Sequence, residues 1–147
     1  PKLQGMRLPL IFLFTLLFWA CPGTQTEPEP GNPISNIQFT FHQDVNKLYF
    51  GAGIESTYNS NSLIQSSLYW FGTHKENVPD TLAFMDDGMN GDIIFNDNFY
   101  AVKVDNDTSH IMNLLGDDSG RVYLHVIADY GSEIITVTDS FRIFILL

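Results

Sequence analysis

The chain is poor in cysteine and in basic side chains, and each shortage excludes classes of protein. It has 147 residues and one cysteine, which excludes an internal disulfide framework and a zinc site of four thiolates. Its seven lysines and arginines are outnumbered by 17 aspartates and glutamates, which gives a formal net charge of −10. Because nucleic acids and anionic lipids are bound by basic surfaces, this charge argues against either as the main partner.

Catalytic motifs are also missing from the sequence. The four histidines are far apart, and no two of them have the short spacing of a metal-binding pair. There is no Gly-x-Ser-x-Gly nucleophile motif and no phosphate-binding glycine loop before a helix. We therefore expect that the protein is not an enzyme. The alternative is a small hydrolase whose histidine and carboxylate meet only in the folded chain.

The longest apolar run is short and lies near the start of the sequence. It covers residues 8–20 and follows Lys2 and Arg7. As a helix it would span about 20 Å, which is less than the roughly 30 Å hydrocarbon core of a bilayer. A basic start followed by a short apolar stretch predicts a secretory signal peptide over residues 1–20 rather than a permanent membrane anchor.

The end of this run resembles the lipobox of bacterial lipoproteins, where signal peptidase cuts before a cysteine that is then lipidated. Ala20 and Cys21 fit that motif, whereas Phe18 and Trp19 depart from the leucine and the small residue that it prefers. The resemblance implies an exported protein that lipid on Cys21 anchors to the bacterial outer membrane or cell surface. The alternative is a stray thiol at the edge of an ordinary signal peptide.

The segment after Cys21 has the composition of a linker. Residues 22–33 contain four prolines and no apolar side chain able to seed a core. Such a stretch stays extended and semi-rigid, so we predict a Pro-rich linker over residues 21–33, with a disordered N-terminus as the alternative. One folded domain is expected over residues 34–147.

Within that domain, apolar residues recur at every second position, which is the period of half-buried strands. Turns rich in aspartate, asparagine and glycine separate the runs, and only residues 110–115 suggest a helical turn. About seven short strands with turns every 8–12 residues predict an all-β, immunoglobulin-like antiparallel β-sandwich. The clearest alternation is at Ile37, Phe39 and Phe41, at Val122, Leu124, Val126 and Ala128, and at Ile135, Val137, Phe141, Ile143 and Ile145.

Residues 86–100 are the most informative segment, because they contain four aspartates and two glycines. Closely spaced oxygen ligands are what calcium requires, and glycines let the backbone turn around an ion. The candidate ligands of a calcium site in this segment are Asp86, Asn90, Asp92 and Asp97. The alternative is two linked turns in which aspartate and asparagine side chains cap their own backbone. The strand-like flanks exclude an EF-hand.

The same segment resembles the Asp-Asp-Gly-x-x-Gly-Asp-x-x-x-x-Asp-Gly-x-Tyr signature of bacterial extracellular immunoglobulin-like modules. Asn98 replaces the last glycine of that signature, and the resemblance covers roughly residues 81–145. It carries no catalytic residue and implies a structural or protein-interaction module. The matching positions are Asp86, Asp87, Gly88, Gly91, Asp92, Asp97 and Tyr100.

Three consecutive aromatic residues, Tyr69, Trp70 and Phe71, lie on a predicted strand. Neighbouring strand residues point to opposite faces, so at least one ring is expected at the surface, where it can stack on a sugar. A carbohydrate-binding module is therefore the alternative function. Trp70 itself is expected in the core, because immunoglobulin-like sandwiches often bury a tryptophan on a central strand.

Overall fold

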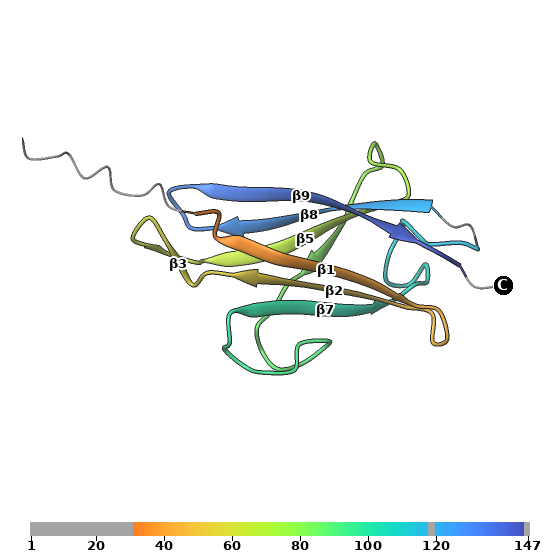
Figure 1. Cartoon of the computed structure of the whole chain (residues 1–147), viewed down its shortest axis with the longest axis horizontal. Helices are drawn as coiled ribbons and strands as arrows, with labels where there is room; N and C mark the ends of the chain where they lie inside the picture. Colours follow the sequence, from red (N-terminus) through yellow and green to blue (C-terminus); the bar gives the residue numbers. More distant parts are fainter. Residues whose placement is uncertain (1–30, 118–119, 146–147) are drawn as a thin grey trace, which may run out of the picture.

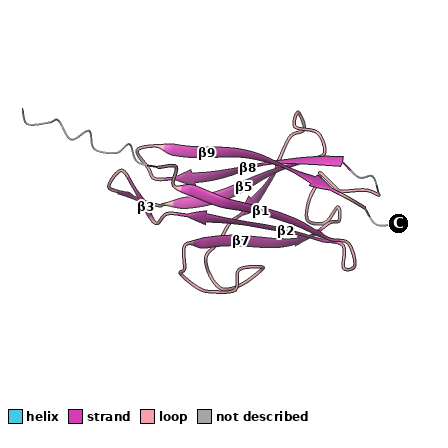
Figure 2. Ribbon diagram, viewed as in Figure 1, coloured by secondary structure: helices cyan, strands magenta, loops and turns pink. Residues whose placement is uncertain are grey.

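The computed structural model describes residues 31–117 and 120–145. The predicted signal peptide, Cys21 and most of the predicted linker lie outside the described residues. The described residues form strands and loops. They include no helix, and therefore no helix able to cross a membrane (Figure 2). The strands are β1 (Ile34–His42), β2 (Lys47–Ile54), β3 (Thr57–Tyr58), β4 (Asn61–Ser62), β5 (Gln65–Gly72), β6 (Asp80–Ala83), β7 (Phe99–Asp105), β8 (Gly120–Asp129) and β9 (Ile134–Ile143).

Seven of the strands form two antiparallel sheets that pack on one another (Figure 1). One sheet has the order β1-β2-β7 and the other the order β6-β5-β8-β9. The predicted all-β sandwich is confirmed, and β3 and β4 add a small hairpin that was not expected. Without the β3–β4 hairpin, β6 is the fourth strand in chain order. In the constant-type immunoglobulin arrangement the fourth strand belongs to the sheet of the first two strands. Here β6 instead pairs with β5, in the sheet opposite β1 and β2.

Side chains from both sheets form the core, and Trp70 lies at its centre. Trp70 is fully buried on β5, as predicted. Its ring stacks on Phe39 of β1 and meets Phe50 of β2 edge-on, with centroid distances of 5.2 and 5.1 Å. The predicted alternation is clearest on β8, where Val122, Leu124, Val126 and Ala128 are all fully buried.

Residues 110–115 do not form the expected helical turn. The carboxylate of Asp80 accepts hydrogen bonds from the backbone N–H groups of Met112 and Asn113, at 2.7 and 2.9 Å. The N–H of Leu115 donates to the side-chain oxygen of Asn106 at 2.9 Å. Because the side chains of Asp80 and Asn106 accept these three N–H groups, the groups do not need helical hydrogen bonds.

Candidate functional site

The aspartate-rich loop, residues 84–98, connects the two sheets. It leaves β6 at the edge of one sheet and crosses to β7 at the edge of the other. There Met85 and Ala101 exchange two backbone hydrogen bonds, and the N–H of Lys103 donates to the carbonyl oxygen of Asn90. The loop therefore covers the edge of β7, which would otherwise present unpaired backbone groups.

Five positions in the loop have a left-handed backbone: Gly88, Asn90, Gly91, Asn96 and Asn98. Gly91 has φ of 114°, and a Cβ there would lie 3.0 Å from the backbone nitrogen of Lys103. Asn98 has φ of 64°, a conformation that asparagine tolerates better than most residues. Asn98 thus has a positive φ, which glycine adopts readily and asparagine tolerates.

Three aspartates cap the backbone N–H of the residue two positions further on, and Asp92 Oδ1 does so for Ile94 at 3.4 Å. Asp87 Oδ1 accepts the N–H of Met89 and Asp97 Oδ1 accepts the N–H of Phe99, both at 2.9 Å. These are Asx turns, in which the side chain takes the place of a backbone acceptor. This part of the loop is what the linked-turn interpretation of the sequence predicts.

Asp86 and Asp92 also hold together residues that are further apart. Asp86 accepts the N–H groups of Asp97 and Asn98 at 3.2 and 2.8 Å, and so ties the start of the loop to its end. Asp92 is buried, and its Oδ2 accepts the N–H of Gly88 at 2.6 Å. The backbone of the loop is consequently fixed by its own carboxylates.

Three of the four predicted calcium ligands lie together. Oxygens of Asp86, Asp92 and Asp97 are all within 4.8 Å of one another. Oxygens that share one Ca²⁺ at 2.3–2.6 Å lie at most about 5 Å apart, so the three carboxylates fit around one ion. Asn90, the fourth candidate ligand, is exposed, and its backbone carbonyl oxygen accepts a hydrogen bond from the N–H of Lys103. Calcium binding stays a prediction.

The negative charge of the three-carboxylate cluster affects the pKa values of Tyr49 and Tyr100. Burial raises the pKa of Tyr100 above its usual value of 10.0, and the negative charge of Asp86 raises it further. Burial likewise raises the pKa of Tyr49, with a second contribution from Asp92. Both phenols are therefore harder to ionise in the folded chain, so the stability that they contribute is present below pH 10 and is lost as pH rises through their raised pKa values.

We expect the two tyrosines to respond to different aspartates. Asp86→Asn should lower the pKa of Tyr100 and leave that of Tyr49 unchanged, because the substitution removes one negative charge and keeps the shape. Asp92→Asn should do the reverse. NMR titration of the tyrosine ring carbons measures both values in each variant. Equal shifts of both tyrosines in either variant would contradict the placement of the carboxylates.

The loop also exposes large apolar side chains, which the sequence analysis missed. Twelve large hydrophobic side chains are exposed among the described residues, and five of them lie within eleven positions of this loop. The only signal in the sequence is the run Ile93-Ile94-Phe95 inside a polar segment. We call these five the apolar patch: Met85, Met89, Ile93, Ile94 and Phe95, which are 51–88% exposed.

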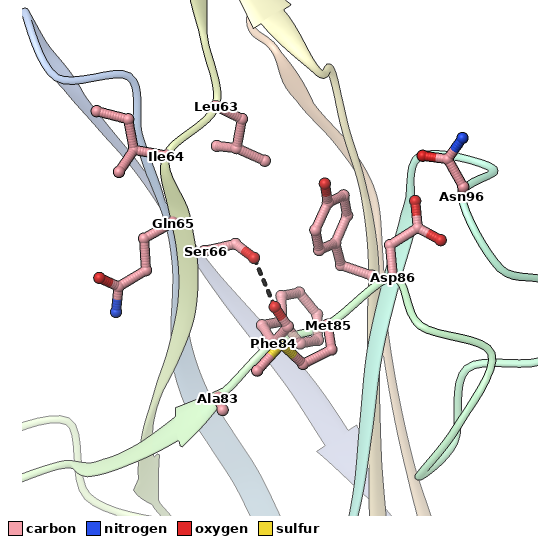
Figure 3. Close-up of a pocket in the computed structure, with 10 residues that line it drawn as sticks. Leu63, Ile64, Gln65, Ser66, Ala83, Phe84, Met85, Asp86 and Asn96 are labelled. Atoms are coloured by element: carbon pink, nitrogen blue, oxygen red, sulfur yellow. Dashed lines mark hydrogen bonds between the residues drawn. The ribbon is translucent and has the colours of Figure 1, made fainter.

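A pocket of about 390 Å³ lies between the loop and the start of β5 (Figure 3). It exists because β6 ends at Ala83, so β5 has no paired neighbour on this side before Ser67. Across the pocket, the Ser66 hydroxyl donates to the carbonyl oxygen of Phe84 at 2.6 Å. The pocket is lined by Leu63, Ile64, Gln65, Ser66, Ala83, Phe84, Met85, Asp86, Asn96 and Tyr100.

In the aromatic run of β5, where at least one ring was expected at the surface, one ring is partly exposed. Trp70 is 0% and Phe71 is 8% exposed, so neither can stack on a sugar, and only Tyr69 is partly exposed. Trp70 belongs to the core, whereas Phe71 lies outside the core cluster and is buried because its ring packs on His125 of β8, with ring centroids 4.6 Å apart. Tyr69 pairs with His125 of β8, beside a second pocket of about 360 Å³.

One histidine lies next to a carboxylate. His110 Nδ1 is 2.8 Å from Asp107 Oδ1, and the hydrogen bond lowers the pKa of Asp107. Both side chains are about half exposed, and the same carboxylate oxygen accepts the N–H of Ser109. The pair is therefore part of a local surface turn.

Comparison of the chain with protein-family models, with curated proteins and with solved structures gave no match. A function therefore has to be inferred from the geometry of the described residues and from the sequence pattern. The aspartate-rich loop is the strongest candidate site, because it has a fixed backbone, clustered carboxylates and exposed apolar side chains.

Proposed function

We propose that the protein is an exported, lipid-anchored immunoglobulin-like module with a structural or interaction role at the bacterial cell surface. The observation that carries the proposal is the apolar patch, which a loop with a fixed backbone holds in solvent. Clustered apolar side chains on the surface of a soluble domain mark an interaction site. The loop has the aspartates and two of the three glycines of the bacterial immunoglobulin-like signature, which supports the same class.

Export and anchoring rest on the sequence before the domain. The basic start, the apolar run of residues 8–20 and Ala20-Cys21 support a lipoprotein signal. The first strand begins at Ile34, so twelve residues separate it from Cys21. Such a spacer tethers the folded domain within about 40 Å of its anchor.

Cys21→Ala is the test of the anchor. The unchanged chain, expressed in a bacterium, should take up labelled fatty acid and sediment with the membrane fraction. The variant should lose both, because acylation needs the thiol, while its circular dichroism stays that of the native β-sandwich. Several acyl chains hold a protein firmly, whereas one gives only marginal adhesion. Unlabelled wild type in the soluble fraction would refute the anchor.

A carbohydrate-binding module is the second candidate. The observation in its favour is the outer face of β5 and β8, where the partly exposed Tyr69 lies beside His125 next to the second pocket. That pocket also has Lys75, Tyr123 and Asp139 in its lining, which are polar groups suited to sugar hydroxyls. A small hydrolase has less support, because the His110–Asp107 pair lies on an exposed turn.

A further inference from the structure

The apolar patch has its most exposed side chains in consecutive positions. Ile93 is 88%, Ile94 60% and Phe95 73% exposed. Adjacent Asp92 is 6% exposed and accepts hydrogen bonds from the N–H groups of Gly88 and Ile94, which fixes the backbone on both sides. Since the loop is already ordered, binding through these side chains costs little conformational entropy.

The loop and the start of the domain meet at the same end of β2. The N–H of Ile54 donates to the carbonyl oxygen of Asn98, the last residue of the loop, at 2.9 Å. The next N–H along the chain, that of Glu55, donates to the carbonyl oxygen of Pro33 at 3.0 Å. The chain that leads back to the proposed anchor therefore leaves the domain next to the base of the loop.

The distance to the anchor is short enough for contact. Twelve residues separate Cys21 from Ile34, and a chain of that length spans at most about 40 Å. A domain tethered at this distance stays at high effective concentration near the membrane. A weak apolar contact then suffices to seat the loop on it.

The charge of the loop selects the kind of surface. Residues 84–98 contain four aspartates and no lysine or arginine. Anionic headgroups would be repelled, and the loop of a second copy would bring four more aspartates against these four. Apolar side chains among groups of this charge fit a bilayer with zwitterionic headgroups, into which they reach about 5–10 Å.

We propose that the apolar patch docks on the zwitterionic surface of the bilayer that holds the chain's own lipid anchor. In this arrangement the side chains of Ile93, Ile94 and Phe95 enter the headgroup region. The aspartates of the loop fix its backbone through the hydrogen bonds that they accept. This inference rests on the proposed anchor. It makes the anchored module lie against its membrane through the aspartate-rich loop.

The test places a fluorescent reporter in the patch. The full acylated chain carrying Phe95→Trp is reconstituted into phosphatidylcholine vesicles whose acyl chains are brominated and quench nearby tryptophan. Phe144→Trp is the matched control, because Phe144 is 69% exposed and lies just after β9. Its carbonyl accepts a hydrogen bond from Gln43 in the β1–β2 turn, at the end of β2 away from Pro33. The parent protein gives the background of Trp70, the native tryptophan that remains after cleavage before Cys21.

We expect Phe95→Trp to be quenched several-fold more strongly than Phe144→Trp. Adding Ile93→Asp to the Phe95→Trp chain should abolish the extra quenching, because a charged side chain resists entry into the bilayer. Ile93 is almost fully exposed, so that change leaves the core intact.

Flotation of the vesicles separates the two proposals. Protein that floats with the vesicles while Phe95→Trp is quenched no more than Phe144→Trp keeps the anchor and refutes the docking. Protein that does not float refutes both. A blue-shifted but unquenched emission from the Phe95→Trp chain also refutes bilayer docking, because it shows that a protein surface covers the patch.

Discussion

Trp70→Ala is expected to destabilise the domain by about 3–5 kcal/mol, which is much of the roughly 5–15 kcal/mol of a typical domain. Trp70 is fully buried between the sheets and contacts Phe39 and Phe50. Its Nε1–H donates to the carbonyl oxygen of Asn113 at 2.7 Å, and the substitution leaves that acceptor without its donor. Both the cavity and the lost bond lower the free energy of unfolding.

Urea denaturation followed by circular dichroism measures this effect. Tyr69→Ala is the matched control, since Tyr69 is the neighbouring aromatic residue on the same strand but is partly exposed. We expect it to cost much less than Trp70→Ala. A loss below about 1 kcal/mol for Trp70→Ala would show that the ring is not part of the core.

Calcium is expected to raise the melting temperature by several degrees if Asp86, Asp92 and Asp97 bind it in the native state only. A ligand that binds only the folded state adds RT ln(1 + [L]/Kd), or about 2.7 kcal/mol at one hundred times Kd. Extracellular calcium modules bind with Kd of about 10⁻⁴–10⁻³ M, so the titration has to reach tens of millimolar. Thermal melts in chelator and in calcium give the shift.

Two comparisons distinguish coordination from charge screening. Magnesium prefers octahedral geometry and keeps its waters, so it should give a smaller shift than calcium. Asp92→Asn should abolish most of the calcium-dependent shift, whereas Asp87→Asn removes the same charge from the same loop outside the three-carboxylate cluster and should retain it. Coincident melts in chelator and calcium, or an equal effect of magnesium, would reduce the loop to a pair of turns.

The strands with regular alternation could be predicted because their pattern is local. Val122 to Ala128 alternate without interruption, and each inward residue is fully buried. The β3–β4 hairpin was missed because its strands have two residues each, too few to show a period, although Asn59 and Ser60 form its turn with φ of 46° and 65°. β6 was missed for a related reason: only four residues long, it depends on pairing with β5.

In the candidate site, the local turns could be predicted from the sequence, whereas the contacts between distant parts of the loop could not. Asp87 and Asp97 cap N–H groups two residues ahead, which is a property of the local sequence. The meeting of Asp86 with Asp97 and Asn98 depends on the course of the whole loop. Exposure of Ile93 and its neighbours was not predictable, because a short apolar run between polar residues is equally typical of a buried strand.

The sequence by itself determined the all-β class, the burial of Trp70 and the turn-forming loop, because periodicity, aromatic placement and Asx chemistry act over a few neighbouring residues. The tertiary structure decided which of the remaining side chains are covered. Phe71 is buried because its ring packs on His125 of the neighbouring strand β8, whereas Tyr69 stays partly exposed. Pairing of the loop with β7 gathers three carboxylates and leaves five apolar side chains in solvent, since strand pairing joins residues that are distant in the chain.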